Sequence, residues 1–377
     1  MQAVNQQTVS PIFDKSVGTL LIEWKQKAPG FDAVRLFLAS FILLFHSFAV
    51  CYEDNHHKFQ KALQLPFVHP FLKMILPMFF FLSGFLVCGS AYRLRSTPIF
   101  LLHRILRILP ALLVEVFLSA IFLGPLLSQF TLKEYFNDPL FSQYFYNLIG
   151  SVQFFLPGVF MNHPNSIVNV NLWTLRAEFY SYAFLSALLV TGLLFDRRQF
   201  LITFLLGNLI FLGLLVTVLT WGDAGVVFVR PPLLVYAFFL GVFSFIFSDQ
   251  IQIKKNLFFL SILGLFFFNW KYTTLLGLLS ACYLCLSFGF MDLRKFPLID
   301  RGDYSYGIYL YGYPIQQTLW EVFPFARIGV ILFFLALPLT LIFSILSWTW
   351  IEKPFLKLKK FLPNQQTQTA QSKRTPF

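Results

Sequence analysis

The chain has 377 residues, of which 57% are hydrophobic and 12% are charged, and its mean hydropathy is +0.68. A soluble domain of this size needs more polar surface than that, so the composition excludes an ordinary soluble protein and indicates an integral membrane protein. The formal net charge of +12 fits the basic cytoplasmic loops of such a protein, and we therefore expect no nucleic-acid binding.

Ten apolar stretches follow a polar N-terminal arm, which covers residues 1–30 and is expected to lie in the cytoplasm. A helix needs about 20 apolar residues to cross a hydrocarbon core about 30 Å thick. The stretches predict helices over residues 31–51, 71–90, 99–125, 173–195, 199–220, 228–247, 256–270, 272–290, 304–323 and 328–350. The predicted fold is an all-α integral membrane protein with about ten transmembrane helices. Residues 356–377 form a polar tail that we expect to be disordered.

The loop charges orient these helices. With the N-terminus inside, the cytoplasmic loops hold roughly twenty Lys and Arg residues and the outer loops about six. This bias predicts that both termini are cytoplasmic and that the protein is a multi-pass protein of the inner (cytoplasmic) membrane, in contact with membrane lipids. The longest outer segment, residues 126–172, is rich in aromatic side chains, which favours a helix or lid lying on the membrane surface.

The first helix carries Arg35 and His46, eleven residues apart. Eleven residues make about three helical turns, so the two side chains share one stripe, roughly 16 Å apart along the axis. Ionisable groups inside a membrane are costly and usually functional. A neutral imidazole can accept a proton from an alcohol and return it. The structural alternatives are a snorkelling arginine and a histidine that hydrogen-bonds between helices.

Two further positions carry candidate chemistry. Arg104 and Arg107 are spaced i, i+3 at the cytoplasmic start of the third helix, where guanidinium groups could hold phosphate oxygens or simply obey the positive-inside rule. Glu178 lies about a turn and a half into the fourth helix, after the interfacial Trp173. A carboxylate at that depth needs a partner, which Arg176 or His46 could supply.

These segments resemble six motifs of the membrane-bound acyltransferase 3 family, in the family's order. RLFLASFILLFH is similar to its R-x10-H signature, HRILRILP to its R-x-x-R segment, and NLWTLRAE to its W-[ST]-L-x-x-E motif. FFFLSGFLV resembles the second-helix motif, DYSYGIYLYGYP resembles S-Y-x-x-Y-L-x-H-x-P, and IEKPF resembles the closing E-x-P. The resemblance covers roughly residues 31–355.

The resemblance implies an O-acyltransferase that moves an acyl group, usually acetyl, from cytoplasmic acyl-CoA to a hydroxyl of an extracytoplasmic glycan. The acceptor would be lipopolysaccharide O-antigen or another surface or lipid-linked polysaccharide. Acetyl-CoA would be the co-substrate, and no metal is expected. His46 would be the base or a transient acyl carrier, with Glu178 supporting it or the acceptor. Arg35 would lie on the donor path, and Arg104 and Arg107 would hold the phosphates of coenzyme A. Trp173, Ser83 and Tyr306 would line the substrate site.

The chain departs from the family pattern at Gly312, where the ninth-helix motif has a histidine. Tyr311 or Tyr313 could take over what that histidine does. The alternative function is a multi-pass transporter of a small molecule or glycolipid. Transporters more often show repeated halves and helices broken at matching positions, and the sequence shows neither pattern.

Overall fold

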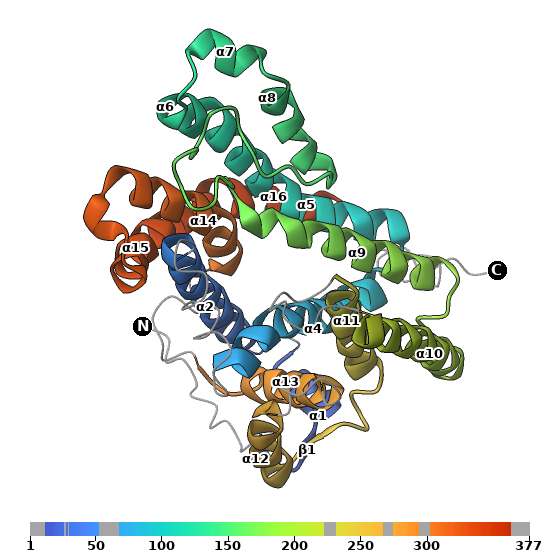
Figure 1. Ribbon diagram of the computed structural model, residues 1–377. Helices are drawn as coiled ribbons and strands as arrows, with labels where there is room; N and C mark the ends of the chain where they lie inside the picture. The colour runs from blue at the N-terminus through green and yellow to red at the C-terminus, as the bar shows by residue number, and fades with distance from the viewer. Residues whose placement is uncertain are drawn as a thin grey trace, which may run out of the picture.

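A computed structural model describes residues 12–25, 28, 30–52, 68–221, 231–266, 274–293 and 302–362 of the protein. This part of the chain is almost entirely helical (Figure 1). A helix occupies most of each of the ten predicted segments. These are α2 (Gly30–Tyr52), α4 (Val68–Leu94), α5 (Thr97–Phe117), α9 (Thr174–Val190), α10 (Arg197–Trp221), α11 (Pro231–Ile246), α12 (Lys255–Gly264), α13 (Thr274–Gly289), α14 (Ser305–Val322) and α15 (Gly329–Ser347).

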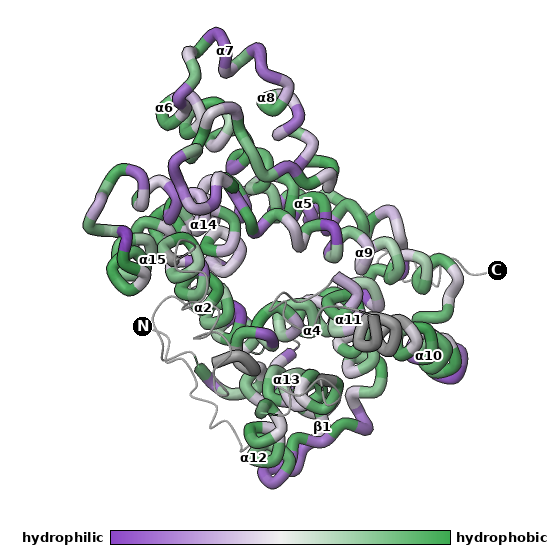
Figure 2. The backbone as a smooth tube through the Cα atoms, viewed as in Figure 1, coloured by the Kyte–Doolittle hydropathy of each residue, from purple (hydrophilic) through white to green (hydrophobic). Residues whose placement is uncertain are grey.

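Within the described ranges, four continuous helical stretches are long and apolar enough to cross a membrane. They are Gly30–Cys51, Leu72–Leu94, Thr97–Leu127 and Gly329–Phe361. The last two include turns of π-helix, because α5 continues through η2 (Leu118–Leu123) into α6 (Gly124–Leu127), and α15 continues through η7 (Trp348–Glu352), α16 (Lys353–Lys357) and η8 (Leu358–Phe361). In Figure 2 the long helices are mostly hydrophobic along their length. The count of ten spans and the cytoplasmic position of the termini stay predictions.

Part of the predicted N-terminal arm is folded against the helices. Strand β1 (Lys15–Ser16) pairs with β2 (Gln252–Ile253) in an antiparallel ladder, and α1 (Val17–Glu23) follows with the Ser16 side chain capping its first turn. Val17 and Leu20 are fully buried in the main core, which explains why residues 12–25 fold against the helices although the arm is polar overall.

Residues 126–172, predicted to lie outside the membrane, fold mainly as a series of short helices at one end of the molecule, beyond α5 and α14 (Figure 1). They are α7 (Leu132–Asn137), α8 (Pro139–Tyr144), η3 (Phe145–Ile149) and η4 (Val170–Trp173). Thr131 and Glu134 form a reciprocal capping box at the start of α7. The segment is fastened to α14 by His163, whose ring nitrogens contact the side chains of Gln317 and Glu321.

Helix α14 packs closely against α2, and Gly312 lies at the crossing. A Cβ atom at Gly312 would come within 2.6 Å of Leu43 Cδ1, so a larger residue here would require the Leu43 side chain to move. One turn further, Gln316 Nε2 donates hydrogen bonds of 2.6 Å to the Leu43 carbonyl and to Ser47 Oγ. The position that holds a histidine in the family motif is therefore a helix-packing point in this protein.

Candidate active site

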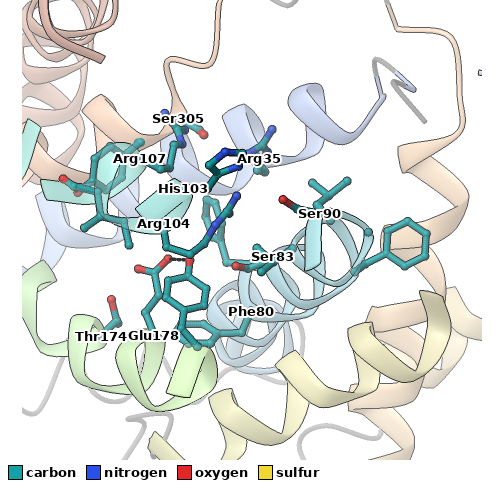
Figure 3. Close-up of a pocket in the computed structure, with 18 of the residues that line it drawn as sticks. Arg35, Phe80, Ser83, Ser90, His103, Arg104, Arg107, Thr174, Glu178 and Ser305 are labelled. Carbon is teal, nitrogen blue, oxygen red and sulfur yellow. Dashed lines mark hydrogen bonds between the residues drawn. The ribbon is translucent and has the colours of Figure 1, made fainter. Parts of the chain in front are cut away.

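A cavity of about 630 Å³ lies among α2, α4, α5, α9 and α14, and its wall is strongly basic (Figure 3). The basic side chains that line it are Arg35, Arg93, His103, Arg104, Arg107 and Lys359. Glu178 is the carboxylate that these groups face within the lining. Ser83 and Tyr306 also line the cavity, so it brings together six of the predicted site residues: Arg35, Ser83, Arg104, Arg107, Glu178 and Tyr306.

Two of the arginines are already engaged by carboxylates. Arg107 donates to Asp303 Oδ2 at 2.5 Å and to Glu352 Oε2 at 2.6 Å, and Arg35 approaches the same Asp303 oxygen at 3.0 Å. Asp32, one turn before Arg35, pairs with it as well. Burial would raise the pKa of Asp303, but Arg35 and Arg107 outweigh it and hold that pKa at about 2. This cluster joins α2, α5 and α14 to the end of the α15 segment.

Arg104 differs from Arg107 because it forms no ion pair with the carboxylates of the described residues. Its Nε atom is buried without a hydrogen-bond partner in that same part of the chain. Figure 3 shows Arg104 and Glu178 reaching the same region of the cavity from α5 and α9. The Tyr182 hydroxyl donates to Glu178, and Tyr182 is also a side-chain partner of Arg104 and of Ser83. Arg104 thus lines the cavity as a guanidinium group that no ion pair neutralises in the described part of the chain.

The structure separates Glu178 from His46, which the sequence suggested as partners. Glu178 turns toward the cavity and bonds to Tyr182, one turn along its own helix. His46 is partly buried, its ring packs edge-on against Tyr313 at a centroid distance of 5.2 Å, and its side-chain partner is the amide of Asn171. Asn171 lies in η4, seven residues before Glu178, and it is Asn171 that contacts the imidazole.

The cavity wall is connected to His46 through Asn171. Thr174 and Tyr309 line it, and their hydroxyl groups are hydrogen-bonded at 2.5 Å. Tyr309 also donates to the Asn171 carbonyl at 2.5 Å, while Asn171 Nδ2 donates to the Tyr309 carbonyl at 2.6 Å. This reciprocal pair ties the imidazole's amide partner to the cavity wall. His46 and Trp173 are not among the lining residues; Trp173 ends η4 and is partly buried.

Sequence reasoning missed three residues of this site: Asn171, Asp303 and Lys359. Asn171 and Asp303 stand inside the quoted motif segments, but neither lies at a motif position, and their partners are distant in sequence. Lys359 lies in η8 beyond the last predicted span, where a cluster of lysines reads as cytoplasmic charge. No group of three or more His, Cys, Asp or Glu side chains among the described residues is arranged to hold a metal ion.

Comparison with known proteins identifies the family of this chain. Residues 29–349 match the family model described as an acyltransferase domain, acyltransferase 3. A protein of Shigella phage Sf6 named O-acetyl transferase is 27% identical over 352 residues, which cover 88% of this chain and 96% of that protein. No solved structure matches the chain. Because the family model covers most of the sequence, the chain belongs to the acyltransferase 3 family.

Proposed function

We propose that this protein is an O-acetyltransferase that moves an acetyl group from acetyl-CoA to a hydroxyl of an extracytoplasmic glycan. The observation that carries the proposal is a basic cavity whose wall includes Thr174 and Tyr309, with Tyr309 hydrogen-bonded to Asn171, the partner of His46. Family membership supports acyl transfer, and the name of the phage relative favours acetyl as the group moved. The motif resemblance supports the glycan acceptor and the inner membrane as the location.

The donor's phosphates fit the part of the cavity wall that is not already neutralised. Arg107 and Arg35 are balanced by Asp303, Glu352 and Asp32, so they serve mainly to build the wall. Arg104 keeps a buried Nε without a partner in the described chain, and Lys359 lines the same cavity. Guanidinium and ammonium groups bind phosphate oxygens through charge-assisted hydrogen bonds. We therefore assign phosphate binding to Arg104 and Lys359. Arg107 has a structural role, in which its ion pairs hold the wall of the cavity together.

His46 acts as the base in this mechanism. It removes the proton of the acceptor hydroxyl as the oxygen attacks the thioester carbonyl carbon, the C–S bond breaks, and the proton passes to the leaving thiolate. The products are an O-acetyl ester and free coenzyme A thiol, so atoms and charges balance. Because Asn171 Nδ2 already donates to the Tyr309 carbonyl, its Oδ1 is the acceptor for an imidazole N–H. That contact fixes which ring nitrogen carries the proton and leaves the other as the base.

The test measures thiol release and acetyl transfer by purified protein in detergent or nanodiscs. His46→Ala is expected to abolish transfer, because no other group at that position can take the proton. Glu178→Gln is expected to abolish transfer too, because the cavity loses the carboxylate that faces Arg104. Arg176→Gln is the matched control, since Arg176 is exposed on the same helix and should leave transfer unchanged. Near-normal transfer by a well-inserted His46→Ala protein would overturn the mechanism.

A further inference from the structure

Glu115 is a buried carboxylate that the proposed mechanism does not use. It lies in α5 with 1% of its surface exposed, outside the lining of the basic cavity. Its Oε1 atom accepts hydrogen bonds from Ser119 Oγ at 3.0 Å and from Asn169 Nδ2 at 2.9 Å. Its Oε2 atom has no hydrogen-bond partner among the described residues, and none of their ion pairs involves it.

A carboxylate in this position is costly to keep. Burial inside a membrane helix removes its hydration, and two neutral donors on one oxygen replace only part of it. The helix changes to π-helix three residues later, at Leu118, a distortion that occurs often at functional sites. The polar groups that face it from other elements are Asn169, Tyr144 and Tyr311. None of them is basic, so Glu115 is not held there by an ion pair.

The bonds made by Asn169 connect Glu115 to the base. Asn169 Nδ2 donates to Glu115 and also to the Leu310 carbonyl at 2.9 Å, which fixes the amide between α5 and α14. Asn169 Oδ1 then accepts from the backbone N–H of Asn171 at 3.1 Å, capping the single turn of η4. Asn171 carries the amide that partners His46. Two residues therefore lie in series between Glu115 and the imidazole: Asn169, and Asn171 through its backbone and its side chain.

We infer that Glu115 is a positioning residue for the acyl-transfer step, acting through Asn169 and Asn171 to hold the imidazole of His46 in its reactive orientation. The inference rests on the proposed function, because it assigns Glu115 a role toward the proposed base. The short η4 turn is held by the Asn169 cap together with the two bonds between Asn171 and Tyr309, and the carboxylate of Glu115 fixes the amide of Asn169 that forms this cap. Glu115 touches neither donor nor acceptor.

Glu115→Ala and Asn169→Ala are each expected to lower kcat by about ten- to a hundredfold, the usual effect of losing an outer partner of a functional group. The KM for acetyl-CoA should not change, because the cavity wall is intact. Glu115→Gln keeps an oxygen acceptor for Asn169 and should restore kcat to within about threefold of the wild type. The Glu115→Ala, Asn169→Ala double variant should lose no more kcat than the less active of the two single variants, because both substitutions break the same series of contacts.

Tyr135→Phe is the matched control. It removes a buried hydrogen bond of 2.7 Å to the Ala120 carbonyl in the same part of the molecule, but that bond does not lead to Asn169. It should lower stability and leave kcat unchanged. Normal kcat in Glu115→Ala and Asn169→Ala, in a preparation whose transfer depends on His46, would overturn the inference. If Glu115→Ala does not fold, the inference is tested by the kcat values of Asn169→Ala, expected to be reduced, and of Glu115→Gln, expected to be near normal. Loss of the His46 dependence itself would instead overturn the proposed function.

Discussion

Arg104 and Arg107 stand one turn apart in the same motif, yet their surroundings predict opposite consequences of losing the charge. Arg104→Gln removes a guanidinium group that lines the cavity and forms no ion pair among the described residues. A hydrogen bond between charged groups contributes about 1.5–3 kcal/mol, and each 1.4 kcal/mol is tenfold, so the KM for acetyl-CoA should rise about ten- to a hundredfold. Stability should change little.

Arg107→Gln removes the partner of two carboxylates, and Glu352 is only 1% exposed. Breaking a buried ion pair from one side costs about 3–5 kcal/mol, because the remaining charge stays buried and unpaired. This variant should therefore unfold at a clearly lower temperature, and whatever folded enzyme remains should bind the donor with a KM near normal. The two variants thus distinguish a role in phosphate binding, which changes the KM for acetyl-CoA, from a structural role, which changes the unfolding temperature.

The assay combines initial rates over a range of acetyl-CoA concentrations with thermal unfolding of the same detergent-solubilised preparations. Arg198→Gln is a useful control, because Arg198 is an exposed arginine outside the cavity and should affect neither quantity. A raised donor KM in Arg107→Gln at unchanged stability, together with a normal KM in Arg104→Gln, would refute the reasoning.

Two further predictions concern stability. Gly312→His should lower the unfolding temperature, because it forces a side chain against Leu43 at the crossing of α2 and α14. The expected cost in stability is about 1–3 kcal/mol. An unchanged Tm would mean that the helices can separate there without cost. The pKa of Asp303 is about 2 in the folded protein, below its ordinary value of 3.8, so its ion pairs stabilise the fold fully above about pH 4 and are lost as the pH falls toward 2. The Tm difference between wild type and Asp303→Asn should accordingly be constant above pH 4 and close below it; a difference that persisted at pH 2 would contradict this.

The helices could be predicted from the sequence because the length of an apolar stretch is a local property. Each apolar stretch of the sequence contains a helix in the structure, with ends that move by a few residues. The basic wall was accessible for a similar reason, since Arg104 and Arg107 share a helix face by spacing alone. Their different roles were not, because the carboxylates that engage Arg107 come from segments 196 and 245 residues away.

Partner choice was the other point that sequence could not decide. Depth alone made Glu178 a plausible partner for His46, but depth does not say which way a side chain turns around its helix. The 3₁₀ turn at Val170–Trp173 precedes α9 and places Asn171 against the imidazole, while Glu178 faces Tyr182 and the cavity. Gly312 was recognised as a departure from the motif, but its role in close packing depends on Leu43 of another helix.

The Arg107 cluster also bears on how the protein is made. Asp303 and Glu352 follow Arg107 by 196 and 245 residues, so Arg107 is synthesised long before the carboxylates that pair with it. A nascent chain that inserts its helices in order must keep this charge near water or lipid headgroups until its C-terminal third arrives. The basic cavity is therefore among the last features to assemble, and a chain cut short before Asp303 would hold Arg107 without either carboxylate.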